Sequence, residues 1–270
     1  MLIRSSIESS YEFLSLFEPH AGDCRVAHRY LKAGWWIRRL AQPAERILPS
    51  PWIMPALTWA EHIDGEQEIR QLKALVARDR LAVDIGAADG CYTWQLMRLA
   101  AACVAFEANP ESAARVRARV PGATVHAYAL SDRQGEAELR VPLRCGHQMK
   151  GWATIEPKNG LNLFDSSTTI RVPMRTLDAF ELPPVGFIKI DVEGHELSVL
   201  RGAETLILRD YPFLMIELND EHYAGTKNAV CEWLGDRNYA TPHGMTSEQN
   251  FLFVPRSRAE EFAALFRAGL

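Results

Sequence analysis

Short apolar runs alternate along the chain with longer segments in which apolar residues recur at helical spacing. Runs of this kind, bounded by turn residues, are typical of buried strands. Strands are predicted over Leu81–Ile85, Val104–Glu107, Thr124–Leu130, Phe187–Val192 and Phe213–Leu218. Helices are predicted between them, over 61–78, from Cys91 onward, over 110–120, up to about 202 and over 227–237. This alternation predicts an α/β fold with a mostly parallel sheet and right-handed crossovers.

Two regions depart from this alternation. Glu136–Val141 has the pattern of a half-exposed strand, and Ile170–Met174 is predicted to pair with it. The polar segment 145–169 between them is longer than a simple connector, and it is placed where a substrate-facing flap would lie. Near the C-terminus, Tyr239–Thr241 and Asn250–Val254 are predicted to pair across a turn at Gly244, before a short final helix.

Residues 1–60 differ in composition from the rest and are predicted to form an N-terminal arm or cap on a domain of residues 61–270. Basic and aromatic residues are interleaved over 25–46, and the prolines that follow, at 43, 49, 51 and 55, are expected to break any helix. A packing arm is the favoured interpretation. A lid or acceptor-binding surface is compatible with it, and attachment to a membrane surface is less favoured.

Composition narrows the classes of function. Of the 270 residues 47% are hydrophobic and 24% charged, and the net charge of −4 gives no indication of nucleic-acid binding. The sequence shows no leading apolar segment of signal-peptide form and no apolar run of transmembrane length. Its five cysteines are scattered and include no Cys-x-x-Cys pair, so reduced thiols in a cytoplasmic protein are expected.

The central feature is the turn after the first apolar strand, where Gly86 and Gly90 have the spacing Gly-x-x-x-Gly. The dinucleotide fingerprint needs a further glycine, so an NAD-dependent oxidoreductase is the least favoured class. Asp84 and Asp89 flank the turn and would repel a phosphate. They suit a ligand that combines a ribose with a positive charge, such as S-adenosylmethionine.

Acidic residues also follow the next two predicted strands. Glu107 is placed to accept hydrogen bonds from both ribose hydroxyls of an adenosine group. Ser131 and Asp132 end the third strand, where the adenine edge would lie, and Asp132 is placed to accept from the adenine amino group. A helix cap or turn role is the alternative for Asp132.

The sequence from about Leu81 to Pro255 resembles the FkbM family of S-adenosylmethionine-dependent methyltransferases. The matching blocks are Val83-Asp84-Ile85-Gly86-Ala87, Ala105-Phe106-Glu107-Ala108-Asn109-Pro110, Ala129-Leu130-Ser131-Asp132, Arg175-Thr176-Leu177-Asp178, Ile188-Lys189-Ile190-Asp191-Val192-Glu193-Gly194-His195-Glu196 and Leu200-Arg201-Gly202-Ala203. The resemblance implies a class I methyltransferase Rossmann-like fold, with a seven-stranded sheet whose last strand is antiparallel. The predicted cofactor-binding set is then Asp84, Gly86, Ala87, Asp89, Gly90, Glu107, Ala108, Asn109, Ser131, Asp132 and Asp191.

Two positions depart from the family pattern. The family usually has Gly-Ala-Asn where this chain has Gly86-Ala87-Ala88, and often Glu-Pro-Asn where Glu107-Ala108-Asn109 stands. The change at Ala88 removes one polar contact near the methionine end of the cofactor.

Asp191 and Glu193 lie at the predicted carboxyl end of a central strand, beside the expected position of the sulfonium methyl group. Transfer to oxygen needs alignment of acceptor, methyl and sulfur, and a base for the hydroxyl proton. His195 is the base that its chemistry favours, with a structural or acceptor-contact role as the alternative. Glu193, Glu217 and His222 are the other candidates, and no serine–histidine–acid set is recognised in the sequence.

A metal site is the less favoured interpretation of the strand ends. Asp191 with Glu217 and Asn219 resembles the layout that holds magnesium in catechol-type methyltransferases. The same side chains also suit hydrogen-bonded strand ends, so no metal is predicted and magnesium is kept as the alternative.

These observations predict a cytoplasmic S-adenosylmethionine-dependent O-methyltransferase that acts on a hydroxyl of a sugar, glycan or natural product and releases S-adenosylhomocysteine. The alternatives are N-methylation of an amino sugar or small amine, and a noncatalytic module that binds a partner through the basic aromatic arm. The intact acids Asp84, Glu107 and Asp191 argue against the noncatalytic module. No nucleic-acid partner is expected, and the oligomeric state is left open.

Overall fold

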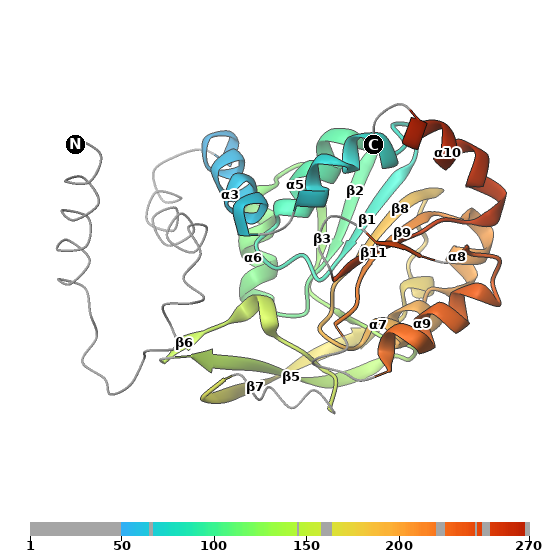
Figure 1. The fold of residues 1–270 in the computed structure, drawn as a ribbon. Helices are drawn as coiled ribbons and strands as arrows, with labels where there is room; N and C mark the ends of the chain where they lie inside the picture. The colour runs from blue at the N-terminus through green and yellow to red at the C-terminus, as the bar shows by residue number, and fades with distance from the viewer. Residues whose placement is uncertain are drawn as a thin grey trace, which may run out of the picture.

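The computed structural model describes residues 50–64, 67–144, 146–157, 164–219, 225–240, 242–244 and 249–267. Most of the predicted N-terminal arm, together with His222, lies outside these residues. Two sheets organise the described chain, and the smaller one lies across one end of the larger (Figure 1).

The larger sheet has seven strands. In sequence order they are β1 (Leu81–Ile85), β2 (Ala102–Phe106), β3 (Thr124–His126), β8 (Val185–Ile190), β9 (Phe213–Glu217), β10 (His243–Gly244) and β11 (Asn250–Phe253). Their spatial order is β10-β11-β9-β8-β1-β2-β3. β11 pairs antiparallel with both of its neighbours, whereas β3, β2, β1, β8 and β9 are parallel. This is the class I methyltransferase sheet, so the predicted fold class is confirmed.

The two-residue period of the strands divides the core between the faces of this sheet. Val83 and Ile85 belong to the apolar cluster on one face, and Ala82 belongs to the cluster on the other. Asp84 and Lys189 are register partners on β1 and β8 and are both buried. A buried carboxylate and ammonium therefore face the same side of the central strands.

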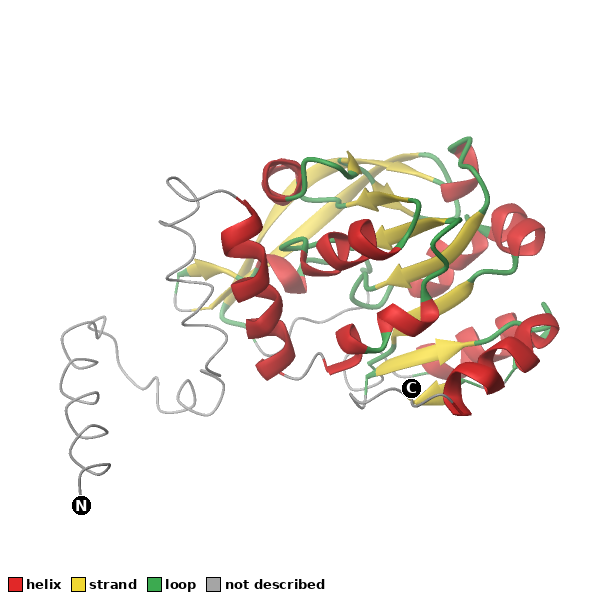
Figure 2. Cartoon of the chain, turned by 90° about the horizontal axis from the view of Figure 1, so that it is seen from above, coloured by secondary structure: helices red, strands yellow, loops and turns green. Residues whose placement is uncertain are grey.

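Helices cover both faces of the larger sheet (Figure 2). One face packs against α7 (Glu196–Arg201), α8 (Glu204–Asp210) and α9 (Thr226–Gly235). The other packs against α4 (Leu72–Leu75), α5 (Cys91–Leu99) and α10 (Ala259–Arg267). Near the β3 edge lies α6 (Pro110–Arg119), which contacts that strand. The strand–helix alternation predicted from the sequence is confirmed for these elements.

The smaller sheet has the order β4-β7-β5-β6, with β4 at Ala129–Leu130, β5 at Gly135–Arg144, β6 at His147–Gln148 and β7 at Ser166–Arg175. β5 and β7 pair antiparallel with Ala137 opposite Val172, which confirms the pairing predicted for this region. The segment between them is more regular than predicted. It contains β6 and a 3-10 turn, η3 (Lys150–Trp152), and Thr154 forms an antiparallel bridge with Arg140.

The single strand predicted over Thr124–Leu130 is wrong. β3 ends at His126, and β4 then pairs in parallel with β7 of the smaller sheet. The chain changes sheets at Ala127 and Tyr128, and no glycine or proline in the run marks this change in the sequence. The residues that follow Leu130 therefore lie at the end of a strand of the smaller sheet and not of the larger one.

The helix predicted over 61–78 is also wrong. It is divided into the end of α3 (Ser50–Asp64), the 3-10 turn η2 (Gln67–Arg70) and the short α4. α3 contains Pro55, so the expectation that the prolines break any helix is wrong at this position. Pro51, the second residue of α3, lies where a backbone N–H would lack an intrahelical partner, whereas Pro55 lies inside the helix, which continues past it with the loss of one backbone hydrogen bond. The buried face of α3 (Ile53, Met54, Leu57) packs against Cys91 and Val120.

At the C-terminal edge, antiparallel pairing is confirmed but begins at different residues. Tyr239 forms one bridge with Pro255, and the ladder proper pairs His243 with Leu252. Gly244 is therefore in strand β10, not in a turn as predicted.

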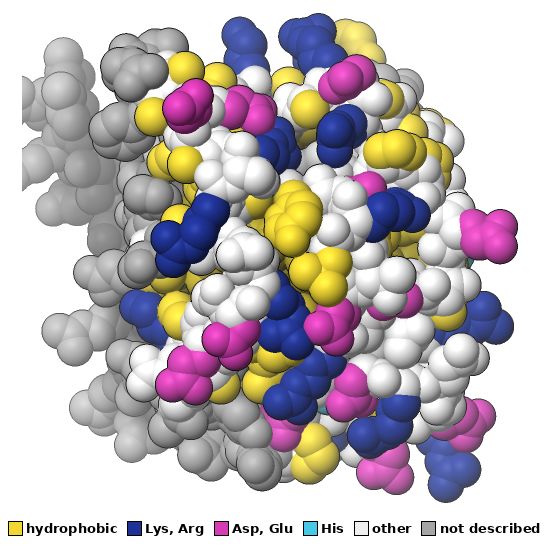
Figure 3. All heavy atoms as spheres, turned by 90° about the vertical axis from the view of Figure 1, so that its right-hand side faces the viewer, with side chains coloured by type: hydrophobic (Ala, Val, Ile, Leu, Met, Phe, Trp, Pro, Cys, Tyr) yellow, Lys and Arg dark blue, Asp and Glu magenta, His cyan; other side chains and the backbone are white. Residues whose placement is uncertain are grey.

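No helix in the described part of the chain combines the length and apolar character needed to cross a membrane. On the face seen in Figure 3, acidic and basic side chains are interspersed with scattered apolar ones. Such mixing is consistent with the small net charge of −4.

Candidate active site

The turn after β1 brings two chain segments into close contact. Gly86 has φ +85°, and a β-carbon there would lie 1.7 Å from the carbonyl oxygen of Asp191. Its amide donates to Phe106 O at 2.9 Å, which fixes the turn to β2. Only glycine fits this backbone conformation and this contact without displacing the end of β8.

Glu107 follows β2 and is held by the backbone of two turns. Its Oε2 accepts from the Ala88 amide and its Oε1 from the Asn109 amide, both at 2.8 Å. The side chain is buried, and this burial raises the pKa of its carboxyl group to about 7, although the two backbone hydrogen bonds oppose the shift. Each carboxylate oxygen has lone pairs beyond these bonds with which it can accept from a ligand.

An open cleft of about 580 Å³ lies between this edge of the larger sheet and the smaller sheet. Six predicted site residues line it, namely Gly86, Glu107, Ala108, Asp191, Glu193 and His195. The opposite wall comes from the smaller sheet and its connection, including Leu139, Lys150, Ala153 and Ile155. The structure therefore brings the turn, the β2 acid and the β8 end to one cavity, and the segment predicted as a flap covers it.

The other predicted cofactor residues do not line this cleft, and Asp84 has an internal role. It accepts a hydrogen bond of 2.5 Å from the Thr93 hydroxyl on α5. Burial raises the pKa of Asp84 to about 6, and the bond from Thr93 and the charge of Lys189 act against the shift. Asp84 faces α5 because its strand neighbours Val83 and Ile85 face the opposite core.

Asp89, Gly90 and Asn109 support the turns around the cleft. Asp89 forms an ion pair with Arg119 of α6 at 2.9 Å. Gly90 caps α5 in the left-handed conformation, and the Asn109 side chain caps α6. Ala87 is packed in the small apolar cluster beneath α6.

Ser131 and Asp132 follow β4, so they lie at the end of a strand of the smaller sheet. Among the described residues, the cleft wall at this point is formed by Tyr128, Ala129 and Leu130. Ser131 is almost fully buried, and a β-carbon on Gly202 would lie 1.9 Å from its carbonyl oxygen. This close packing explains the glycine in the block Leu200-Arg201-Gly202-Ala203.

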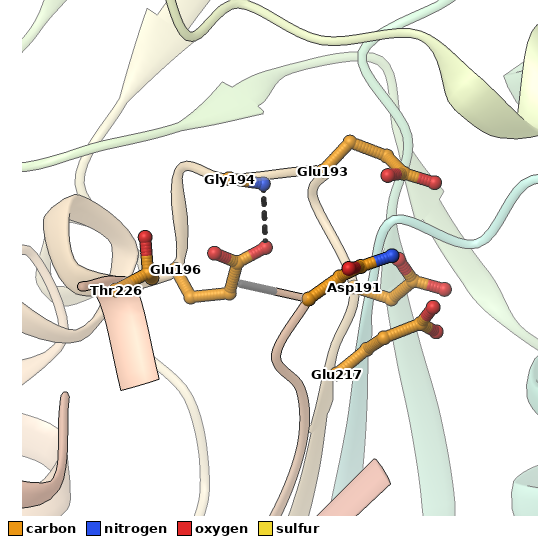
Figure 4. Close-up of a pocket in the computed structure, with 7 residues that line it drawn as sticks. Asp191, Glu193, Gly194, Glu196, Glu217 and Thr226 are labelled. Atoms are coloured by element: carbon orange, nitrogen blue, oxygen red, sulfur yellow. Dashed lines mark hydrogen bonds between the residues drawn. The ribbon is translucent and has the colours of Figure 1, made fainter. Parts of the chain in front are cut away.

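Four carboxyl groups lie near one another at the ends of β8 and β9. Figure 4 shows the side chains of Asp191, Glu193 and Glu217 pointing to one side, while Glu196 accepts from the Gly194 amide at 2.9 Å. Burial raises the pKa of Glu193 well above its ordinary value, and the neighbouring carboxylates, Asp191 first, add to the shift. Burial likewise raises the pKa of Glu196 to about 7.

A smaller recess of about 290 Å³ contains the three residues considered for a metal, Asp191, Glu217 and Asn219. Lys189, the buried residue two positions before Asp191, places its Nζ 3.8 Å from Asp191 and 3.7 Å from Glu217. The same ammonium donates to Asn250 Oδ1 at 2.8 Å. The described residues contain no cluster of three or more histidine, cysteine or acidic side chains that could hold a metal ion.

His195 lies in a hydrogen-bonded chain of side chains. Its Nδ1 is 3.1 Å from Glu156 Oε2, and its Nε2 is 2.9 Å from Ser131 Oγ. A serine–histidine–acid set is thus present, contrary to the sequence analysis. Spacing along the chain gave no signal for it, because Glu156 and Ser131 are 39 and 64 residues from His195.

The sequence also did not single out other residues near the cleft. Within the predicted flap of residues 145–169, the part that lies along the cleft is Lys150–Glu156. Lys150 lines the cleft and pairs with Glu111 of α6, and the Thr154 hydroxyl donates to Glu193 O at 2.8 Å. Tyr128 contributes an aromatic wall, with the Arg175 guanidinium 4.9 Å from its ring centre. The polar character of 145–169 was the only available signal, and it does not single out any of these side chains.

The sequence model described as Methyltransferase FkbM domain matches residues 84–241, more than half of the chain. A curated relative, hexuronic acid methyltransferase AglP of Haloferax volcanii, is 29% identical over 165 residues, which span 57% of this chain and 63% of AglP. The chain thus aligns with less than two thirds of that relative.

Two solved structures with low sequence identity also match. Methyltransferase FkbM from Methylobacillus flagellatus is 14% identical with a TM-score of 0.45, over 80% of this chain and 57% of that one. Magnesium protoporphyrin IX methyltransferase from Synechocystis, with bound S-adenosylmethionine, is 12% identical with a TM-score of 0.41, over 72% and 81% of the two chains.

Proposed function

Because the chain belongs to the FkbM methyltransferase domain family, we propose that it is an S-adenosylmethionine-dependent methyltransferase acting on a hydroxyl oxygen. A sugar or glycan is the favoured acceptor, and the Haloferax relative, by name a hexuronic acid methyltransferase, supports this class. A natural-product hydroxyl is the other acceptor considered. The observation that carries the proposal is the position of Glu107 on the cleft wall beside Gly86.

Glu107 would hold the ribose of the cofactor. Backbone amides from Ala88 and Asn109 fix both carboxylate oxygens, so the group is oriented before the ligand arrives. Charge-assisted hydrogen bonds from two ribose hydroxyls would then contribute both affinity and orientation. Gly86 has no side chain, so the ligand can approach the backbone of this turn closely.

When bound, S-adenosylmethionine supplies an electrophilic methyl group on a positively charged sulfur. Asp191 and Glu193 line the cleft at the end of β8, and the carboxylate of Asp191 would place negative charge beside that sulfonium. His195 lines the same cleft and would accept the proton of the acceptor hydroxyl. The flap wall opposite would hold the acceptor and exclude water.

The same proposal assigns no divalent cation to Asp191 and Glu217. The Lys189 ammonium lies between 3.7 and 3.8 Å from both carboxylates and supplies the compensating positive charge there.

A cytoplasmic location also belongs to the proposal. It is supported by the cysteines of the sequence, which are scattered and include no Cys-x-x-Cys pair.

Calorimetric titration with S-adenosylmethionine and S-adenosylhomocysteine, with NAD as the control ligand, tests the cofactor. Micromolar binding of the first two and none of NAD is expected. A screen of uronic acids, neutral sugars and amino sugars with radiolabelled S-adenosylmethionine then tests the acceptor, with the labelled product digested to locate the methyl group. Label on nitrogen would replace the O-methyl assignment, and absence of cofactor binding would support a noncatalytic module.

A further inference from the structure

The chain of contacts around His195 connects three separate elements. Glu156 comes from the flap, His195 from the turn after β8 and Ser131 from the end of β4. The side chains of His195 and Glu156 are only 11% and 13% exposed, so water competes little for these hydrogen bonds. Both ring nitrogens of His195 are therefore in defined contacts at the edge of the cleft.

We propose that Glu156 is the positioning residue for His195 and fixes the tautomer in which Nδ1 carries the proton. The proposal rests on the function given above, in which His195 accepts the proton of the acceptor hydroxyl. An ionised carboxylate only accepts hydrogen bonds, so Nδ1 must donate to Glu156. In the neutral ring Nε2 then has its lone pair free to accept, as a base requires.

The flap holds Glu156 in place through its backbone. Arg140 Nη2 donates to Glu156 O at 2.5 Å, and the Glu156 amide donates to Thr154 Oγ1 at 3.0 Å. The same Thr154 hydroxyl donates to Glu193 O at 2.8 Å. The smaller sheet and the β8 turn thus fix the distance between carboxylate and imidazole.

Ser131 occupies the basic nitrogen while no acceptor is bound. Its hydroxyl has one proton and two acceptors, His195 Nε2 at 2.9 Å and Asp132 Oδ1 at 3.2 Å. Nε2 has a single lone pair, so the hydroxyl of an acceptor in the cleft must replace the Ser131 hydroxyl at Nε2, and the Ser131 proton is then donated to Asp132. Ser131 is only 1% exposed, which argues against a role for it as a nucleophile.

The step balances with these groups. The acceptor oxygen forms a bond to the methyl carbon as the carbon–sulfur bond breaks, and the bonding pair goes to sulfur, which becomes neutral. The hydroxyl proton passes to His195 Nε2. Glu156 then faces an imidazolium ion, and its negative charge stabilises the positive charge that the ring has gained.

The test compares Glu156→Ala and Glu156→Asp with Glu136→Ala, which removes an exposed carboxylate from β5 of the same sheet. The ¹⁵N shifts of the His195 imidazole are measured on the full chain with S-adenosylhomocysteine. We expect protonated Nδ1 in the parent and in Glu136→Ala, and a shift toward protonated Nε2 in Glu156→Ala. In Glu156→Asp the shorter carboxylate should restore the Nδ1 signal in part.

The same variants separate turnover from binding. For Glu156→Ala we expect kcat to fall about a hundredfold, with partial recovery in Glu156→Asp and little change in KM for the cofactor. Retained cofactor affinity shows that the variant is folded. Protonated Nε2 in the parent, or a kcat for Glu156→Ala equal to that of Glu136→Ala, would overturn the proposal. The tautomer measurement needs no acceptor, so it still tests Glu156 if no sugar is methylated.

Discussion

The carbonyl oxygen of Asp191 lies 1.7 Å from the point that a β-carbon on Gly86 would occupy. The turn after β1 and the end of β8, which the proposed function places beside the cofactor, are therefore packed against each other. The Asp191 amide also donates to Ile85 O at 2.9 Å, which joins the same two segments. A side chain at position 86 cannot be added without moving the residues at the end of β8.

Gly86→Ala is accordingly expected to destabilise the protein by at least about 3 kcal/mol, from overpacking and the left-handed backbone together. Cofactor affinity should fall as well, because Asp191 is displaced. Chemical denaturation and calorimetry measure the two effects. Gly235→Ala is the control, because nothing lies within 4 Å of a β-carbon there. Equal stability of the two variants would contradict this packing argument.

Ala88 adopts φ +47°, the left-handed conformation that asparagine tolerates better than alanine. The left-handed backbone therefore explains why the family usually has asparagine at this position, in addition to any polar contact that its side chain makes. Ala88→Asn is expected to raise the free energy of unfolding by about 1 kcal/mol, since strain of this kind costs on the order of 1–3 kcal/mol.

Ala114→Asn, at an exposed position of α6, serves as the control for Ala88→Asn. It should destabilise slightly, because asparagine is a poorer helix former than alanine. A loss of stability in both variants would show that the strain at Ala88 is not relieved by asparagine.

Glu107→Gln is expected to weaken cofactor binding by about ten- to hundredfold. This factor corresponds to the loss of charge-assisted hydrogen bonds, which contribute about 1.5–3 kcal/mol. A pH series adds a second criterion. Because the Glu107 pKa is raised to about 7 in the free protein, the carboxyl is largely protonated at lower pH and ionised at higher pH. Affinity in the parent should therefore rise with pH through about 7, by at most about tenfold per pH unit.

In Glu107→Gln this pH dependence should be absent, because the amide does not titrate. Calorimetry at several pH values on both proteins decides the point. Affinity in the parent that falls with pH, or an unchanged affinity in the variant, would remove Glu107 from the cofactor site.

Activity is expected to survive chelation of divalent cations by EDTA, because Lys189 already compensates the charges of Asp191 and Glu217. Lys189→Met leaves those carboxylates without their ammonium and should destabilise the protein by about 3–5 kcal/mol. Loss of activity with EDTA and recovery with magnesium would instead place a metal at Asp191, Glu217 and Asn219.

The sequence by itself determined the central parallel strands of the larger sheet and two of the residues that meet at their ends. Apolar runs fixed β1, β2, β8 and β9, because buried parallel strands need continuous apolar stretches. The position of Gly86 at one strand end and Glu107 at the next followed from that order. Both line the cleft, as local pattern and parallel topology together require.

Only the tertiary structure decided the neighbours of those residues. The change of sheets after His126 and the pairing of β4 with β7 join segments far apart in the chain, and residue pattern does not encode that choice. The same holds for the contact of His195 with Glu156 and Ser131, which three separate elements supply. Hydrophobic periodicity reports which face of an element is buried, whereas side-chain contacts depend on how the elements pack.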